Sequence, residues 1–426
     1  VYPELNFTLP PLTIEEATWA QVRGHYERIA EMIVRRSTAL HVPGLVVEFE
    51  QLPAMTDRPQ WGAEITAILA AGLKKLHEAT GIPCALRVTV VDLRDAVRPP
   101  LLRTGDSWGR TKEAFICAAQ AGADILSIES IGGKEVHDEA LVYGDLDGIV
   151  FALGVLSCRD MAFLWDEITA IARQHNSVSG GDTACGFGNT AMQLAGKGML
   201  PTALAALVRA ATCPRSLVAY EHGAVGPSKD CAYEGPVMKA IAGVPISMEG
   251  KSSSCAHFSP LGNIAGAAAD LWSNESVQNI QLLSGPAPEA FLELLAYDCR
   301  LFNVATRSGE AKRLRDWLVA SDTPTSAEAL MLEPTTVIDL SKAIVAAGEN
   351  GYARTLAAVR VARDAISAAI NAGRLALPAR EKDWLKRLNT AVDNLPETEA
   401  EAIERASGQY AHLYRPEAYG LEAGGG

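Results

Sequence analysis

Acidic and thiol side chains collect at the ends of predicted β-strands and in the polar turns that follow them. These residues are Glu50, Glu129, Asp182, Cys185, Glu221, Cys231 and Glu249. Two thiolates with a carboxylate or an imidazole form a zinc site that keeps a fourth position open for substrate. Zinc in such a site acts as a Lewis acid on a bound oxygen atom. The residue types therefore predict metal-assisted chemistry, although no CxxC pair singles out the ligands by spacing.

The cysteines divide into two groups by their surroundings. Five lie in apolar or helical contexts and are expected to be reduced core thiols: Cys84, Cys117, Cys158, Cys213 and Cys299. Cys185, Cys231 and Cys255 instead lie in polar turns rich in Gly, Ser or Asp. Cys255 and His257, in the segment SSSCAHF, offer a competing ligand pair, so the residues alone leave more than one metal-binding set open.

Composition and charge indicate a soluble globular protein. The 426 residues carry a net charge of −13, and 48% of them are hydrophobic. The negative charge disfavours nucleic acids and anionic membranes as partners, because both attract clustered Lys and Arg. The N-terminal VYPELNFTLPPLTIEE lacks a basic segment followed by an apolar one, and no apolar run reaches the ~18–20 residues of a membrane span. We therefore expect a cytoplasmic location.

Short β-rich runs alternate with longer amphipathic segments from residue 44 onward. The predicted strands are 45–50, 84–91, 125–129, 148–154, 177–181, 216–221, 244–249 and 277–283. The predicted helices between them include 61–80, 107–121, 160–174 and 190–211. Strand and helix in repetition imply parallel pairing with right-handed crossovers. Eight such units over about 250 residues suit a (β/α)8 barrel, and the lack of a GxGxxG after the first strand disfavours an open dinucleotide-binding sheet.

Segments on both sides of the barrel are predicted to be helical. Residues 1–43 form an N-terminal helical segment, in which apolar side chains recur at helical spacing. We place the catalytic barrel at 44–285. After it the strand signal fades, and residues 286–426 are expected to form a C-terminal helical layer packed on the barrel.

Long motifs, spread in order over nearly the whole chain, resemble those of a known family. The longest are SIESIGGKEV (127–136), SGGDTACGFGNTAM (179–192), CPRSLVAYEHGAVGPSKDCAYE (213–234) and MEGKSSSCAH (248–257). Shorter ones are WGAEI (61–65), DLWSNESVQ (270–278), AYDCRLFNVA (296–305) and YRPEAYG (414–420). Together they resemble the zinc subunit of the methanol:corrinoid methyltransferases, a family whose fold is a TIM barrel with added helices.

The resemblance implies a zinc site of one glutamate and two cysteines. By local motif the ligands fall on Glu129 in SIES, Cys185 in GDTAC and Cys231 in SKDCAYE. Cys255 and His257 lie in a matched motif and would line the site nearby. The family precedent is also a homodimer that binds a corrinoid protein.

The resemblance further implies transfer of a methyl group from methanol to the Co(I) corrinoid of a partner protein. Hydroxide is a poor leaving group, so the zinc would have to stabilise charge on the oxygen as the C–O bond breaks. The corrinoid would come from the partner, because this chain has no DxHxxG corrinoid-binding signature. A proton donor is also expected, and Asp182 and Glu221 are the candidates, with an orienting role as the alternative for both.

Three other functions remain open at this point. The same zinc set could demethylate a methoxylated aromatic or another small methyl donor. A zinc TIM-barrel lyase or hydrolase would work without a corrinoid. The third is a catalytically silent scaffold for a corrinoid protein, against which the intact ligand trio argues.

Overall fold

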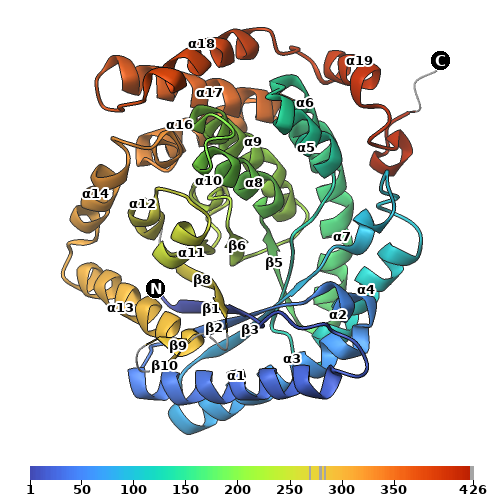
Figure 1. The fold of residues 1–426 in the computed structure, drawn as a ribbon, viewed down its shortest axis with the longest axis vertical. Coiled ribbons are helices and arrows are strands. Elements are labelled where there is room, and N and C mark those ends of the chain that lie inside the picture. The colour runs from blue at the N-terminus through green and yellow to red at the C-terminus, as the bar shows by residue number, and fades with distance from the viewer. Residues whose placement is uncertain (268–269, 278–280, 283–284, 423–426) are drawn as a thin grey trace.

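Eight parallel strands form the centre of the protein. The computed structural model describes residues 1–267, 270–277, 281–282 and 285–422. The strands follow the order β5-β4-β3-β2-β1-β8-β7-β6. The two strands that end this order, β5 and β6, also contact each other, and the amide of Val225, three residues before β6, donates to the carbonyl oxygen of Ser179 in β5 at 2.9 Å. The sheet therefore closes on itself, which confirms the predicted (β/α)8 barrel (Figure 1).

The strands are short and the helices around them are long. The barrel strands are β1 (Pro3–Thr8), β2 (Leu45–Glu50), β3 (Cys84–Val90), β4 (Ile125–Ile128), β5 (Val178–Asp182), β6 (Ser228–Asp230), β7 (Ile246–Glu249) and β8 (Asp270–Val277). A separate antiparallel pair comprises β9 (Gln281–Leu282) and β10 (Gly285–Pro286).

The helices that accompany the barrel strands extend through residue 267. They are α1 (Trp19–Leu40), α2 (Pro53–Asp57), α3 (Pro59–Thr80), α4 (Asp106–Gln120), α5 (Lys134–Tyr143), α6 (Leu146–Phe151), α7 (Cys158–His175), α8 (Cys185–Gly196), α9 (Thr202–Glu221), α10 (Gly235–Ala242), α11 (Lys251–Ala256) and α12 (Gly262–Ala267). The later helices are α13 (Ala287–Arg307), α14 (Ala311–Asp322), α15 (Ala327–Leu330), α16 (Pro334–Ala346), α17 (Gly351–Asn371), α18 (Ala379–Asp393) and α19 (Glu399–Tyr410).

Helix α1 forms because its apolar side chains recur on one face, and that face packs on the barrel. The Trp19 ring stacks on Trp61 of α3 with centroids 4.4 Å apart, and the Trp19 indole N–H donates to Glu64 at 2.7 Å. About two turns later, Tyr26 packs edge-on against Phe49 of β2. Aromatic pairs of this kind fasten the helix pair α1 and α3 to the strands.

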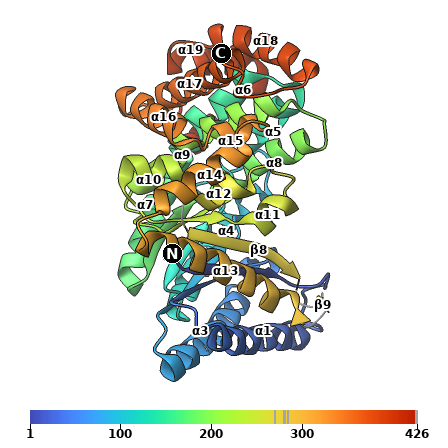
Figure 2. The same ribbon diagram turned by 90° about the vertical axis from the view of Figure 1, so that its left-hand side faces the viewer.

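Helix α9 lies between the barrel and the C-terminal helices and is buried from Ala203 to Ala219. Helix α17 packs along it, and α16 packs on α17. Figures 1 and 2 show α18 and α19 at one end of the molecule and the helices α1 and α3 at the other. A second apolar core therefore fills the space between the barrel and the C-terminal layer.

One helical run in the described part of the chain, Leu146–His175, has the length and apolar composition of a membrane span. It comprises α6, a π-helical segment at Ala152–Ser157, and α7. Because 83% of its most apolar window is buried inside the protein, burial in the protein core accounts for the apolar composition.

Two of the predicted strands are wrong. Residues 148–154 belong to α6 and the π-helical segment, and residues 216–221 form the end of α9. Both are short, largely apolar segments, and helix α17 of the C-terminal layer packs against the elements that contain them. A short apolar run buried on all sides does not distinguish a strand from a helix by periodicity.

Two strands of the barrel were not predicted. Strand β1 lies in the segment 1–43 that we expected to be helical, yet it pairs with β2 and β8. Strand β6 is only three residues long, and its sequence SKD is polar. The predicted strand 277–283 lies largely outside the described residues, and β8 occupies 270–277 instead. The division of the chain into domains at 43 and 285 stays a prediction.

A buried arginine connects strands across the barrel interior. Arg87 of β3 is fully buried and donates to both carboxylate oxygens of Glu4 on β1, at 2.5 and 3.1 Å. It also donates to Ser127 of β4 and to the carbonyl oxygen of Pro227, which precedes β6, both at 2.8 Å. Charged groups are buried in this way only when ion pairs and hydrogen bonds compensate for lost hydration.

Replacing Arg87 should destabilise the barrel. In Arg87→Met the Glu4 carboxylate stays buried without its partner, so we expect the free energy of unfolding to fall by about 3–5 kcal/mol. Guanidinium denaturation followed by circular dichroism measures this change. Lys74→Met, which removes an exposed pair with Glu78, is the control and should unfold like the unmodified protein. Equal unfolding of the two variants would contradict the role of Arg87.

Candidate metal centre

Glu129, Cys185 and Cys231 come together at the carboxyl ends of three strands. Glu129 follows β4, Cys185 begins the helix after β5, and Cys231 follows β6. One potential ligand atom from each residue lies within 4.8 Å of the other two. Residues 56 and 102 positions apart in the sequence thus meet because parallel strands point the same way in a closed barrel.

The geometry of this cluster fits a tetrahedral zinc ion. With zinc–sulfur bonds of roughly 2.3 Å, ligand atoms on one ion lie about 4 Å apart. Burial raises the pKa of the Cys231 thiol well above its usual range. The hydrogen bond with Cys231 lowers the pKa of Cys185, but burial and nearby carboxylates outweigh it and raise this pKa to about 12. A dication is the group that would stabilise both as thiolates.

Lys229 holds the carboxylate of Glu129. Its ammonium nitrogen lies 2.8 Å from Glu129 Oε1 and also contacts Glu48 at 3.1 Å and Glu50 at 3.2 Å. Burial raises the pKa of Glu129 to about 7, and the charge of Lys229 opposes this effect. Lys229 and Glu48 are buried, whereas Glu50 and Glu129 are partly exposed, so this ion cluster connects the barrel interior to the candidate ligand Glu129. Lys229 lies two residues before Cys231, and nothing in its local sequence indicated this role.

The two cysteine-bearing loops are tied to each other. The amide of Cys231 donates to Thr183 Oγ1 at 3.1 Å, and the amide of Ala184 donates to Glu234 Oε1 at 2.8 Å. Each loop therefore supplies a side chain that binds the backbone of the other. Such reciprocal bonds restrict movement of the thiols relative to each other.

The Cys185 end of α8 has two further contacts. Asn189 donates to Cys185 Sγ at 3.0 Å. Lys134 of α5 donates to the carbonyl oxygen of Gly186 at 2.9 Å. The first residue of α5, the helix that follows Glu129, thus reaches the residue next to Cys185 and links the segments that carry two of the candidate ligands.

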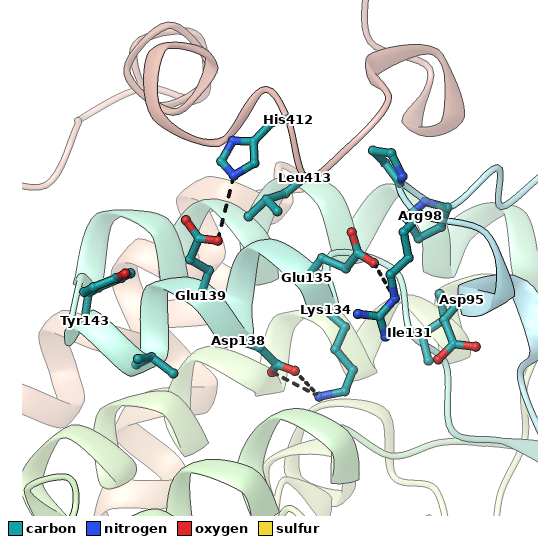
Figure 3. Close-up of a pocket in the computed structure, with 13 residues that line it drawn as sticks. Asp95, Arg98, Ile131, Lys134, Glu135, Asp138, Glu139, Tyr143, His412 and Leu413 are labelled. Atoms are coloured by element: carbon teal, nitrogen blue, oxygen red, sulfur yellow. Dashed lines mark hydrogen bonds and ion pairs between the residues drawn. The ribbon is translucent and has the colours of Figure 1, made fainter.

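A charged groove of about 590 Å³ lies beside this junction (Figure 3). Helix α5 forms one wall, and residues 95–100 and 412–413 form the rest. Ion pairs cross or line it: Lys134–Asp138, Arg98–Glu135 and His412–Glu139. Lys134 lines the groove and also binds Gly186, but Glu129, Cys185 and Cys231 do not line it.

Asp182 is a buried member of an ion pair. Arg215 of α9 lies 3.0 Å from Asp182 Oδ2 and also donates to Ser130 Oγ. The amide of Ser130 donates to Asp182 Oδ1 at 3.4 Å. Asp182 therefore helps to position the residue after Glu129, as the orienting alternative expects, and its role as a proton donor stays a prediction.

Glu221 is not part of the cluster. It is the last residue of α9, and the chain then passes into β6, so Glu221 lies at the amino end of the strands. Its carboxylate pairs with Arg354 of α17 at 2.8 Å. The proton-donor prediction for Glu221 depended on a strand at 216–221, and it fails because that segment is helical.

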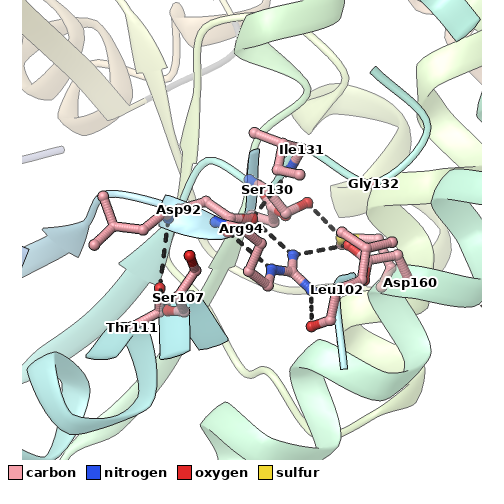
Figure 4. Close-up of polar contacts among 12 residues, drawn as sticks. Asp92, Arg94, Leu102, Ser107, Thr111, Ser130, Ile131, Gly132 and Asp160 are labelled. Atoms are coloured by element: carbon pink, nitrogen blue, oxygen red, sulfur yellow. Dashed lines mark hydrogen bonds and ion pairs between the residues drawn. The ribbon is translucent and has the colours of Figure 1, made fainter. Parts of the chain in front are cut away.

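A second buried network holds the loop after Glu129 (Figure 4). Arg94 is almost fully buried and binds Asp92 at 2.7 Å and Asp160 at 2.7 Å. Asp92 in turn accepts the amide of Ile131 at 3.2 Å. The backbone two residues beyond Glu129 is therefore anchored to the turn that follows β3, and through Arg94 to Asp160 of α7.

Glu249 and His257 form a pair of their own. His257 Nδ1 lies 3.0 Å from Glu249 Oε2, at the carboxyl end of β7. The side chain of Cys255 lies outside the described part of the structure, so the competing ligand pair predicted from SSSCAHF is tested only for its histidine. The histidine has a carboxylate partner, which favours the role of a nearby lining group.

The whole chain matches known methyltransferases. A family model described as the methanol-cobalamin methyltransferase B subunit matches residues 1–420. The methanol–corrinoid protein co-methyltransferase of Methanosarcina barkeri is 37% identical over 426 residues, which cover 98% of this chain and 91% of that protein. The crystal structure of the methanol:cobalamin methyltransferase complex MtaBC from Methanosarcina barkeri matches with a TM-score of 0.94 and 37% identity, covering 99% of this chain and 92% of that one. This chain therefore belongs to the methanol-cobalamin methyltransferase B subunit family.

Proposed function

We propose that this protein transfers the methyl group of methanol to the Co(I) corrinoid of a partner protein. The main support is the convergence of Glu129, Cys185 and Cys231 to within 4.8 Å in a member of this methyltransferase family. In the reaction the C–O bond breaks with its electron pair on oxygen, and the electron pair of Co(I) forms the Co–C bond. The oxygen takes up one proton and leaves as water.

Zinc is the metal that this donor set would hold. Two thiolates and a carboxylate are typical zinc ligands, and three protein ligands leave one position for a substrate. When bound there, zinc would supply Lewis-acid polarisation of the methanol oxygen. The protein would supply the rest by holding the ligands in place and limiting the access of water.

Lys229 orients the carboxylate ligand. It binds Glu129 Oε1, so the carboxylate can offer its other oxygen to a metal ion. Because Lys229 is buried with Glu48 and Glu50, its position is determined from several sides. A ligand held in this way needs little rearrangement when the metal binds.

A corrinoid protein is the partner that this site requires. The ligands lie at the carboxyl ends of the strands, so the corrinoid would approach from that end of the barrel. The related crystal structure, a methanol:cobalamin methyltransferase complex, supports such a partner. A cytoplasmic location is part of the proposal, because the described cysteines are free thiols, as expected in a reducing compartment.

An exposed apolar stripe on α13 supports a homodimer. Leu294, Tyr297, Leu301 and Val304 are each about half exposed, with fractions of 52, 52, 52 and 49%. Their spacing of three, four and three residues places them on one face of the helix. A second copy of α13 packed antiparallel about a twofold axis would cover the stripe, because such an interface is self-complementary.

The purified protein should bind about one zinc ion per chain. Replacing Cys185 or Cys231 by alanine removes a thiolate ligand and should release the metal, which mass spectrometry of total zinc measures. Cys117→Ala, a change on α4 outside the cluster, is the control and should keep its zinc. Full zinc occupancy in either ligand variant would refute the assignment.

Methanol should methylate free cob(I)alamin in the presence of the zinc-loaded protein. Formation of methylcobalamin can be followed by its absorbance under anaerobic conditions. Cys231→Ala should reduce the rate by at least about a hundredfold, since metal-assisted charge stabilisation supplies several kcal/mol. Turnover of methanol without any corrinoid would instead favour the lyase or hydrolase alternative.

A charge introduced into the α13 stripe should disrupt the dimer. Leu301→Arg would bury an unpaired cation at the interface, so light scattering at micromolar concentration should show a monomer. Val345→Arg, at an exposed apolar residue on α16, is the matched control and should remain a dimer. If the unmodified protein is monomeric, the homodimer proposal fails.

A further inference from the structure

In the described part of the structure, one carboxylate oxygen of Glu249 binds two side chains and the other binds none. The Tyr233 hydroxyl donates to Glu249 Oε2 at 3.1 Å, and His257 Nδ1 lies 3.0 Å from the same atom. Among the residues that the structure describes, nothing hydrogen-bonds to Glu249 Oε1. The Glu249 side chain is fully buried, so water does not solvate this oxygen as it would at the surface.

Glu249 lies next to Cys231, one of the candidate metal ligands. Strands β6 and β7 run side by side, with Asp230 paired to Met248. Cys231 and Glu249 are the next residues along each strand. The negative charge of Glu249 also raises the pKa of both Cys231 and Cys185. The strand register thus places Glu249 beside Cys231.

A buried acceptor without a donor is unfavourable, and few occur in native proteins without a functional reason. The two contacts to Oε2 hold the Glu249 side chain in place. An ionised carboxylate accepts hydrogen bonds and donates none. The group that would satisfy Oε1 is therefore a ligand with an O–H or N–H bond, small enough to enter beside the cysteines.

We propose that Glu249 Oε1 accepts a hydrogen bond from the hydroxyl group of the methyl donor, and that this contact selects an alcohol over a methyl ether. The inference rests on the proposed function and specifies its substrate. Methanol would donate its hydroxyl hydrogen to Glu249 and present its oxygen to the metal centre. The oxygen of an ether carries no hydrogen, so a bound ether would leave the buried acceptor unpaired.

Sites that bind a substrate hydroxyl through a buried partner reject analogues without that hydroxyl, often by several orders of magnitude. Ethanol and dimethyl ether provide a matched pair of probes, because they are isomers with the same number of heavy atoms. Only ethanol has a hydroxyl hydrogen. A difference between them as competitors of methanol therefore reports hydrogen bonding and not size.

The experiment measures methyl transfer from methanol to free cob(I)alamin by the zinc-loaded protein, with each isomer as an inhibitor. Ethanol should inhibit with a constant at least about tenfold lower than dimethyl ether. In Glu249→Gln the amide nitrogen replaces the acceptor, so the KM for methanol should rise at least about tenfold and the preference for ethanol should disappear. Zinc content should not change, and Glu221→Gln, at the other end of the barrel, should behave like the unmodified protein.

The possible outcomes separate this inference from the proposed function. Equal inhibition by the two isomers in the unmodified protein overturns the role of Glu249 whether or not any variant folds, while methyl transfer itself still stands. The role of Glu249 is also overturned if Glu249→Gln leaves unchanged both the KM for methanol and the preference for ethanol over dimethyl ether as an inhibitor. Loss of zinc from that variant would assign Glu249 to the metal centre instead. If the unmodified protein does not methylate cob(I)alamin, the proposed function fails and this inference fails with it.

Discussion

Lys229 places one ammonium group among three carboxylates inside the barrel, in contact with Glu48, Glu50 and Glu129. Burial of one partner without the others would be strongly unfavourable, so the four groups depend on each other. They come from β2, from the end of β4 and from β6. The ion cluster therefore requires the closed barrel, and in return it directs the Glu129 carboxylate toward the two thiols.

Hydrogen bonds and ion pairs also hold the loops that follow the strands and carry the candidate ligands. Thr183 and Glu234 tie the two cysteine loops to each other. Arg215 and Arg94, both buried, anchor the segment after Glu129 through Asp182 and Asp92. Loops at strand ends are usually the mobile part of a barrel, and here buried charges fasten them. A metal site assembled from three separate loops needs this stiffness, because small displacements of a ligand weaken binding.

Methanol presents almost no surface for recognition. Its affinity must therefore come mainly from bonds to its oxygen. The ligand trio and the unpaired oxygen of Glu249 lie on neighbouring strand ends, at β4, β5, β6 and β7. One side of the hydroxyl group would meet the metal centre and the other a carboxylate. A barrel is suited to this task because it surrounds a small molecule with strand ends from several directions.

Local patterns in the sequence determined most of the alternation of strands and helices, because hydrophobic periodicity is a property of short segments. The candidate ligands Glu129, Cys185 and Cys231 came from the resemblance of long motifs to a known family, since the residue types alone left other ligand sets open. Long-range packing decided the rest. Residues 148–154 and 216–221 are helical, and the C-terminal layer packs against both of these helical elements. Residues 3–8 form a strand, which fills the place between β2 and β8 and pairs with both. The roles of Asp182, Glu221 and Lys229 followed from partners distant in the sequence. Ion pairs and barrel closure depend on distances in space, which the spacing of residues along one chain does not specify.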